Sequence, residues 1–111
     1  MAKSKNETSQ SAQDQNFQID YSELRKAVLV LRALNHKLRQ KMLELIDQGA
    51  RLTVSEIYIK LRIEQSVASQ HLAILRRAGV VKTERSGKFI YYSIDKQRIK
   101  QISSLAAELV A

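Results

Sequence analysis

The apolar residues of this chain follow two different periods, and the order of those periods limits the folds that it can adopt. From residue 20 to residue 78, apolar side chains recur every three or four positions, as in amphipathic helices. Residues 80–94 are instead rich in β-branched and aromatic side chains, which predicts a β-hairpin with its turn at Ser86-Gly87. The helical period returns at residue 95. The pattern therefore predicts a mainly α protein with one small β-hairpin.

Capping residues and glycines divide the helical part into segments. Asp20 is a candidate N-cap that forms a capping box with Glu23, while Gly49 and Gly79 are suited to end helices. The predicted helices span residues 20–34, 36–48, 55–61 and 65–78, with a last helix from Asp95 onward. This order is that of a winged helix-turn-helix with additional helices at both ends.

The charge of the chain points to a polyanionic partner. Its 111 residues contain 19 Lys and Arg against 11 Asp and Glu, which gives a net charge of +8. The charges within residues 1–16 cancel, and this segment has little apolar surface to bury, so we predict a disordered polar tail. The whole excess then lies on residues 17–111, which we interpret as one domain for DNA binding and dimerisation.

Several classes of protein are excluded or disfavoured by what the sequence lacks. Without cysteine the chain cannot form a disulfide or a thiolate metal site, and it has neither a signal peptide nor an apolar run long enough to cross a membrane. We therefore expect a soluble, cytoplasmic protein. Common catalytic motifs such as GxSxG and HExxH are absent, and Ser69 and His71 would point to different sides of one helix. We expect no enzymatic activity and no cofactor.

The helix predicted over residues 65–78 begins with short polar side chains, which allow a helix to approach base edges and phosphates closely. Basic side chains flank the predicted hairpin turn and suit phosphate contacts. The candidate DNA-binding residues are Gln65, Ser66, Ser69, Gln70, Arg76, Arg85 and Lys88. The alternatives are that the polar residues are simply solvated, that the hairpin charges protect a strand edge, and that Arg76 or Arg77 complements the helix dipole.

Three stretches carry a resemblance to a known family. The run ALNHKLRQKMLELI contains Arg39 ahead of an apolar face, LRIEQSVASQHLAILRRAGVV contains Ser66, Ser69 and His71, and KFIYYSI closes the hairpin with an aromatic pair. On these residues the chain from residue 33 to residue 94 resembles the ArsR/SmtB family of bacterial winged-helix repressors. The resemblance implies that the helix over residues 65–78 is the recognition helix and that the protein represses transcription.

The first and last helices carry more apolar surface than a compact winged-helix core needs, and in the resembling family these two helices form the dimer. A homodimer would present two recognition helices to a pseudo-palindromic operator. The candidate interface residues are Tyr21, Leu24, Val28, Leu31, Ile102, Leu105 and Leu109. The alternative is a monomer in which both helices fold back onto their own core.

Members of that family commonly sense metals, but neither of their two ligand sets is complete here. The helix before the recognition helix reads LTVSEI and has no thiol, and Asp95 is followed by Gln97 with no histidine in residues 95–111. We expect no metal site, an N-cap role for Asp95, and structural roles for His36 and His71. The signal is not visible, and constitutive DNA binding, nonspecific architectural DNA binding or a protein-interaction module stay open as alternatives.

Overall fold

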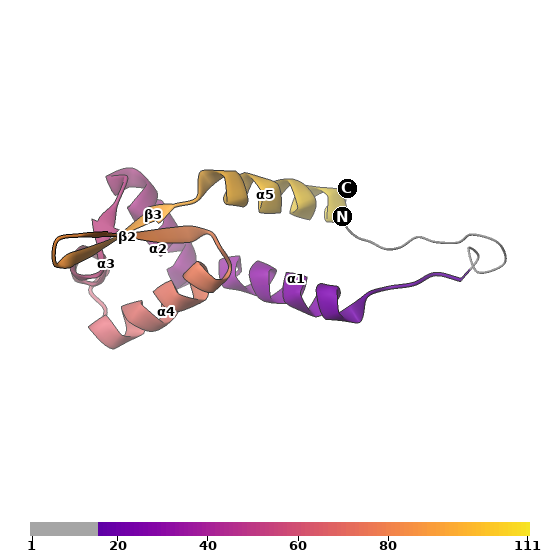
Figure 1. Ribbon diagram of the computed structural model, residues 1–111, viewed down its shortest axis with the longest axis horizontal. Coiled ribbons are helices and arrows are strands. Elements are labelled where there is room, and N and C mark those ends of the chain that lie inside the picture. Colours follow the sequence, from indigo (N-terminus) through magenta and orange to yellow (C-terminus); the bar gives the residue numbers. More distant parts are fainter. Residues whose placement is uncertain (1–15) are drawn as a thin grey trace.

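The computed structural model describes residues 16–111, so the predicted disordered tail lies outside the described residues except for Asn16. Within this range the chain forms five helices and one three-stranded antiparallel sheet (Figure 1). The elements are α1 (Tyr21–Leu34), α2 (Lys37–Gly49), β1 (Leu52–Thr53), α3 (Val54–Leu61), α4 (Gln65–Arg77), β2 (Val81–Ser86), β3 (Phe89–Ile94) and α5 (Lys96–Val110). The predicted winged helix-turn-helix with extra terminal helices is confirmed. No helix among the described residues is long and apolar enough to span a membrane.

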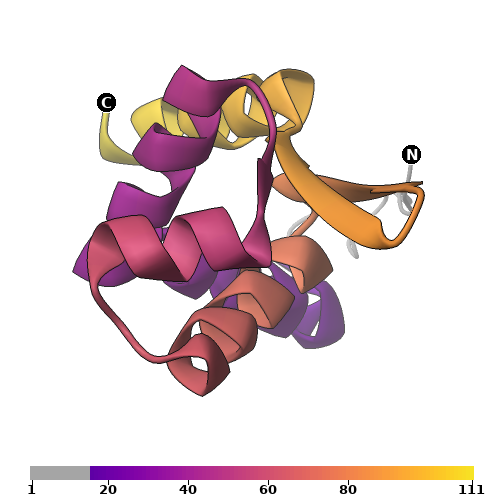
Figure 2. The same cartoon turned by 90° about the vertical axis from the view of Figure 1, so that its left-hand side faces the viewer.

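The sheet has the strand order β1-β3-β2, and its β2–β3 hairpin is the wing. The hairpin projects beyond the helices (Figure 2). Its turn lies one residue later than predicted: Ser86 pairs with Phe89, and the two turn residues are Gly87 and Lys88. Gly87 has a φ of +63°, and a positive φ at the first turn position suits glycine. The sequence analysis missed β1, because two residues are too few to show an alternating pattern.

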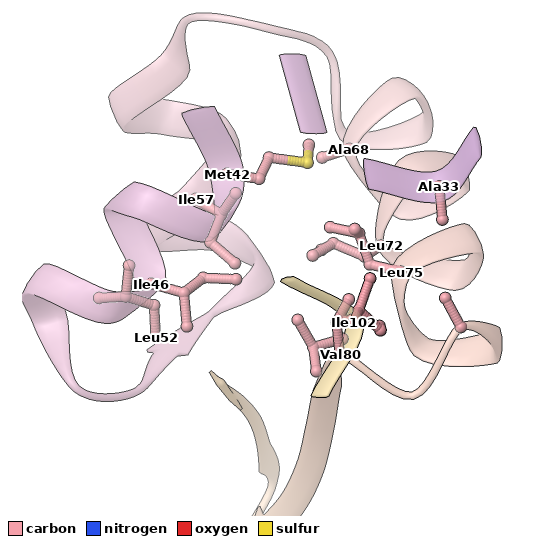
Figure 3. Close-up of a cluster of buried hydrophobic side chains, with 12 residues drawn as sticks. Ala33, Met42, Ile46, Leu52, Ile57, Ala68, Leu72, Leu75, Val80 and Ile102 are labelled. Carbon is pink, nitrogen blue, oxygen red and sulfur yellow. The ribbon is translucent and has the colours of Figure 1, made fainter. Parts of the chain in front are cut away.

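The hydrophobic core lies where α2, α3 and α4 meet the base of the wing (Figure 3). Its largest fully buried side chains are Met42, Ile46, Ile57, Leu72, Leu75 and Val80. Each comes from an apolar stripe with helical spacing or from the segment that leads into β2. Burial of such side chains is the main favourable contribution to folding, and here it fixes α4 relative to the wing.

The end of α2 differs from the prediction, because Gly49 is its last helical residue and the positive φ of 68° falls on Ala50. The Arg51 amide donates to the Gly49 carbonyl at 2.7 Å, which closes a strained γ-turn around Ala50. Gly49 is required for space instead: a Cβ there would lie 2.7 Å from a methyl carbon of Leu52. The close approach lets Leu52 enter the core and start β1.

The helix caps were largely readable from the sequence. Asp20 caps α1 as predicted, but Glu23 does not complete the capping box. The reciprocal capping box is instead formed at α3, where Thr53 and Glu56 each bond the other's backbone amide. Gly79 ends α4 as predicted: its amide donates to Arg76 and that of Val80 donates to Leu75, which is the Schellman pattern.

Two helical segments extend together away from the wing (Figure 1). We call residues 21–31 of α1 and residues 103–110 of α5 the arm. Ala33 is the one buried residue of α1, and the preceding residues of that helix are mostly exposed. The arm therefore receives little of its stability from the core of its own chain.

Candidate nucleic-acid interface

The pair α3 and α4 forms the helix-turn-helix, and a tight turn of three residues joins the two helices. Arg62 in this turn adopts a left-handed conformation with a φ of 57°. The Ile63 amide donates to the Tyr58 carbonyl at 3.1 Å, which closes the end of α3. This geometry directs the chain sharply into α4, the recognition helix of the fold (Figure 2).

The two faces of α4 differ sharply in burial. Ala68, Leu72 and Leu75 are fully buried against the core. Opposite them, the four candidate polar residues Gln65, Ser66, Ser69 and Gln70 are all exposed. Glutamine can make two hydrogen bonds to adenine, and hydroxyl groups can bond phosphates or base edges. The fold thus brings the predicted polar set together on one free surface of the recognition helix.

The N-terminus of α4 is also available to a ligand, in contrast to the other helices. Side chains of Asp20, His36, Thr53 and Asp95 accept hydrogen bonds from first-turn amides of α1, α2, α3 and α5. Glu64, the N-cap of α4, makes no such bond. The first amides of the recognition helix therefore have no capping side chain, and such amides together with the helix dipole favour a phosphate group.

A cleft of about 440 Å³ runs beside α4 and is bordered by the wing strand β3. Its lining residues are Ser69, Ala73, Arg76, Arg77 and Tyr92. Two guanidinium groups, a serine hydroxyl and a phenol in one cleft are well matched to phosphate oxygens. The sequence analysis had left Arg77 to the helix dipole and had given Tyr92 no contact role, because their proximity depends on how β3 packs beside α4.

The strand register separates the basic residues of the wing. Arg85 pairs with Ile90, and side chains of paired residues lie on the same face, which is also the face of Tyr92. Lys82 pairs with Ser93 and lies on the opposite face. Lys88 lies in the turn. The Arg85 Nε donates to the Gly87 carbonyl at 3.3 Å, so this side chain follows the wing tip.

The second face of the wing is occupied by a contact with the α2–β1 connection. The guanidinium of Arg51 lies 4.1 Å from the ring centroid of Tyr91, a cation–π contact. The same guanidinium pairs with Glu84 at 3.8 Å. These contacts brace the exposed hairpin from one side. They leave the face that carries Arg85 open.

The predicted interface residues of the arm are exposed, with one exception. Tyr21, Leu24, Val28, Leu31, Leu105 and Leu109 are between 37% and 75% exposed. A groove of about 480 Å³ lies between α1 and α5, and it is lined mainly by apolar side chains of both helices. Ile102 is the exception: it is 6% exposed and belongs to the core of its own chain, so it supports the groove from within.

No group of three or more His, Cys, Asp or Glu side chains that could hold a metal ion occurs in residues 16–111. Asp95 accepts a hydrogen bond from the Arg98 amide at 3.1 Å and so caps α5. His36 caps α2 through its Nδ1, which accepts from the Leu38 amide at 3.2 Å. His71 contacts Arg39 and the ring of His36. The polar side chains suggested by the metal-site comparison thus have structural partners.

A helix-turn-helix with a polar recognition face beside a basic hairpin defines the class of winged-helix DNA-binding proteins. Residues 36–83 match the family model described as bacterial regulatory protein, arsR family. Transcriptional repressor PagR of Bacillus anthracis is 33% identical over 90 residues, which cover 81% of this chain and 90% of PagR. The crystal structure of PagR matches with a TM-score of 0.61 at 32% identity, over 78% of this chain and 99% of that chain.

Two further relatives extend this likeness. Transcriptional activator HlyU of Vibrio cholerae is 35% identical over 84 residues, 76% of this chain and 77% of HlyU. The uncharacterized regulator YbzH of Bacillus subtilis is 50% identical over 50 residues, which span 45% of this chain and half of YbzH. The chain belongs to the ArsR family and is a DNA-binding transcriptional regulator.

Proposed function

We propose that the protein is a repressor that binds a pseudo-palindromic operator as a homodimer, with α4 in the major groove. The observation that carries this proposal is the position of the four exposed polar residues of α4 beside the cleft that holds Arg76, Arg77 and Tyr92. Gln65 and Gln70 would read base edges, while Ser66 and Ser69 would bond bases or phosphates. The cleft would hold a backbone phosphate.

In the same proposal, the wing contacts the DNA beside the major groove. Arg85 lies on the face that includes Tyr92, and Lys88 lies at the tip, so both can reach phosphates or an adjacent minor groove. Binding to genomic DNA places the protein in the cytoplasm and requires no catalytic step. PagR is named a repressor and HlyU an activator, so the relatives occur with both signs of regulation. Repression follows if the operator overlaps a promoter.

The arm supports the homodimer. A helix of 14 residues is marginal in water unless its apolar face is packed, and in α1 only Ala33 is buried. A second copy would cover the exposed leucines of α1 and α5 in an isologous contact. Substitution of Leu105 by Asp should place a charge in that contact and cost several kcal/mol of association free energy. Sedimentation velocity of the parent chain, Leu105→Asp and the control Ile59→Asp on α3 tests this proposal; a monomeric parent at micromolar concentration contradicts it.

The DNA contacts can be tested by fluorescence anisotropy with an operator selected from random sequence and with random DNA, across a salt series. Gln70→Ala should weaken operator binding by about 1–3 kcal/mol and leave random DNA nearly unchanged. Arg85→Ala should weaken both and reduce the salt slope by about one unit. Lys82→Ala removes the same charge from the opposite wing face, and Gln97→Ala removes a glutamine from α5; both are controls.

Two outcomes distinguish the proposal from the other uses of this fold. A nonspecific architectural protein would bind operator and random DNA alike, and Gln70→Ala would then have no selective effect. A protein-interaction module would bind neither. Equal losses for Arg85→Ala and Lys82→Ala would contradict the proposed orientation of the wing, because those residues lie on opposite faces.

A further inference from the structure

Arg39 of α2 is a buried charged residue that joins three parts of the chain. It is 9% exposed. Its Nε donates to the carbonyl of Ala33 at 2.7 Å, and its Nη2 donates to the carbonyl of Arg32 at 2.9 Å. Its Nη1 lies 3.1 Å from Nδ1 of His71, in the middle of the recognition helix. One guanidinium therefore ties the end of α1, where the arm begins, to α4.

These contacts define the protonation state of both histidines. A guanidinium can only donate hydrogen bonds, so Nδ1 of His71 must accept and cannot carry a proton. The amide of Leu38 donates to Nδ1 of His36, so this nitrogen must also be unprotonated. The two rings lie 4.9 Å apart. Both imidazoles are thus neutral, with the proton on Nε2, and protonation of either ring would remove one of these hydrogen bonds.

We propose that His36, Arg39 and His71 form a proton-sensitive brace, in which two neutral imidazoles allow Arg39 to hold the recognition helix in its DNA-binding orientation. Protonation of His71 would point an N–H at a guanidinium 3.1 Å away and place two positive charges in contact. Protonation of His36 would remove the N-cap of α2 and add a charge next to His71. Acidification therefore releases α4 from the arm and weakens DNA binding. The inference rests on the proposed function of α4.

The surroundings of the brace contain no group that would neutralise an added proton. Arg39 from α2 and His36 from the α1–α2 connection are the ionisable groups that bear on His71, and α1 contributes only backbone carbonyls. The other elements that pack on α4 use their carboxylates elsewhere: Glu56 of α3 bonds Thr53, and Glu84 of β2 pairs with Arg51. Within residues 16–111, no carboxylate is hydrogen-bonded or ion-paired to either imidazole.

The electrostatics agree with this geometry. Burial lowers the pKa of His71 below 6.5, and the positive charges of His36 and Arg39 lower it further. Because the pKa is lower in the folded chain than in the unfolded chain, the stabilisation from neutral His71 is fully present above the unfolded pKa. It is lost as the pH falls through the folded pKa. The brace is therefore intact at neutral pH and weakens under mildly acidic conditions.

The test compares operator affinity at about pH 7.5 and about pH 5 for the parent chain and for two substitutions that cannot take up a proton in this range. His71→Gln retains an oxygen acceptor for Arg39, and His36→Asn retains a helix N-cap. The probe is a duplex of roughly 30 base pairs, enriched from random sequence by the protein at neutral pH. The parent affinity should fall about tenfold or more on acidification, whereas that of the double variant should change less than about twofold.

A second measurement examines the brace without DNA. The nitrogen NMR signals of both imidazoles should show an unprotonated Nδ1 and a protonated Nε2 at neutral pH, and His71 should titrate below the usual range. A proton on Nδ1 of His71 at neutral pH overturns the inference. A double variant that keeps the pH dependence of the parent, or a parent affinity that rises in acid, also overturns it. Failure to bind any DNA at neutral pH would instead contradict the proposed function, while the NMR titration still decides the state of the brace.

Discussion

The winged-helix core and the arm use similar apolar residues, but only the core buries them. Leu72 and Leu75 on α4 have no exposed surface, whereas Leu105 and Leu109 on α5 are 54% and 75% exposed. Both pairs recur at helical spacing in the sequence. The difference shows that the same pattern stabilises the protomer in one region and leaves a surface for another chain in the other. Substitutions in the two regions should therefore affect different equilibria.

The largest contrast should come from truncating one leucine in each region. Leu72→Ala removes a fully buried side chain and should lower the free energy of unfolding by about 2–5 kcal/mol, independently of protein concentration. Leu105→Ala should leave the unfolding of the monomer within about 0.5 kcal/mol of the parent and shift the association equilibrium instead. Urea unfolding at several protein concentrations measures both effects. Equal, concentration-independent losses would remove the distinction between core and arm.

Two adjacent positions at the end of α2 should respond with opposite signs. Gly49→Ala places a Cβ 2.7 Å from Leu52 and should destabilise the core by about 1–3 kcal/mol. Ala50→Gly relieves a positive φ and should stabilise it by about 1 kcal/mol. Thermal unfolding of the two variants provides the comparison. If Gly49→Ala were the stabilising one, the close packing of Leu52 would not be what requires glycine.

Loss of a helix cap should cost about 1 kcal/mol in either region, but the loss should be visible by different methods. Thr53→Ala removes the capping box of α3 and should lower the global stability of the core. Asp20→Ala removes the cap of α1 and should mainly increase amide exchange in the arm. Hydrogen exchange resolved by residue separates the two. A global destabilisation by Asp20→Ala would mean that the arm unfolds together with the core.

The smallest effect should come from the ion pair that links the two helices α2 and α5. Nζ of Lys96 lies 3.6 Å from Asp47, and both side chains are more than half exposed. Exposed pairs of this kind contribute little, so Lys96→Met should change the free energy of unfolding by less than about 0.5 kcal/mol. Thermal unfolding at low and high salt checks this expectation. A larger, salt-dependent loss would show that the pair helps to fix α5 against the core.

Local rules determined much of this protein from the sequence alone. Helical periods, the caps at Asp20 and Asp95, and Gly79 define the helices, while the β-branched run defines the wing, because each signal acts over only a few residues. The same periods placed Leu72 and Leu75 in the core and the polar residues of α4 on its free face. They could not separate Ile102 from Leu105, since both belong to one apolar stripe and only packing buries the first.

Tertiary structure decided the features that depend on residues far apart in the chain. Tyr92 joins the cleft beside α4 only because β3 packs there, and β1 exists only because Leu52 and Thr53 meet the ladder of β3. A turn shifted by one residue pairs Arg85 with Ile90 instead of Lys88. Arg39 and His71 are 32 positions apart, and their contact requires α1, α2 and α4 to converge. No pattern of short range encodes such a convergence, because it results from the simultaneous burial of several apolar faces.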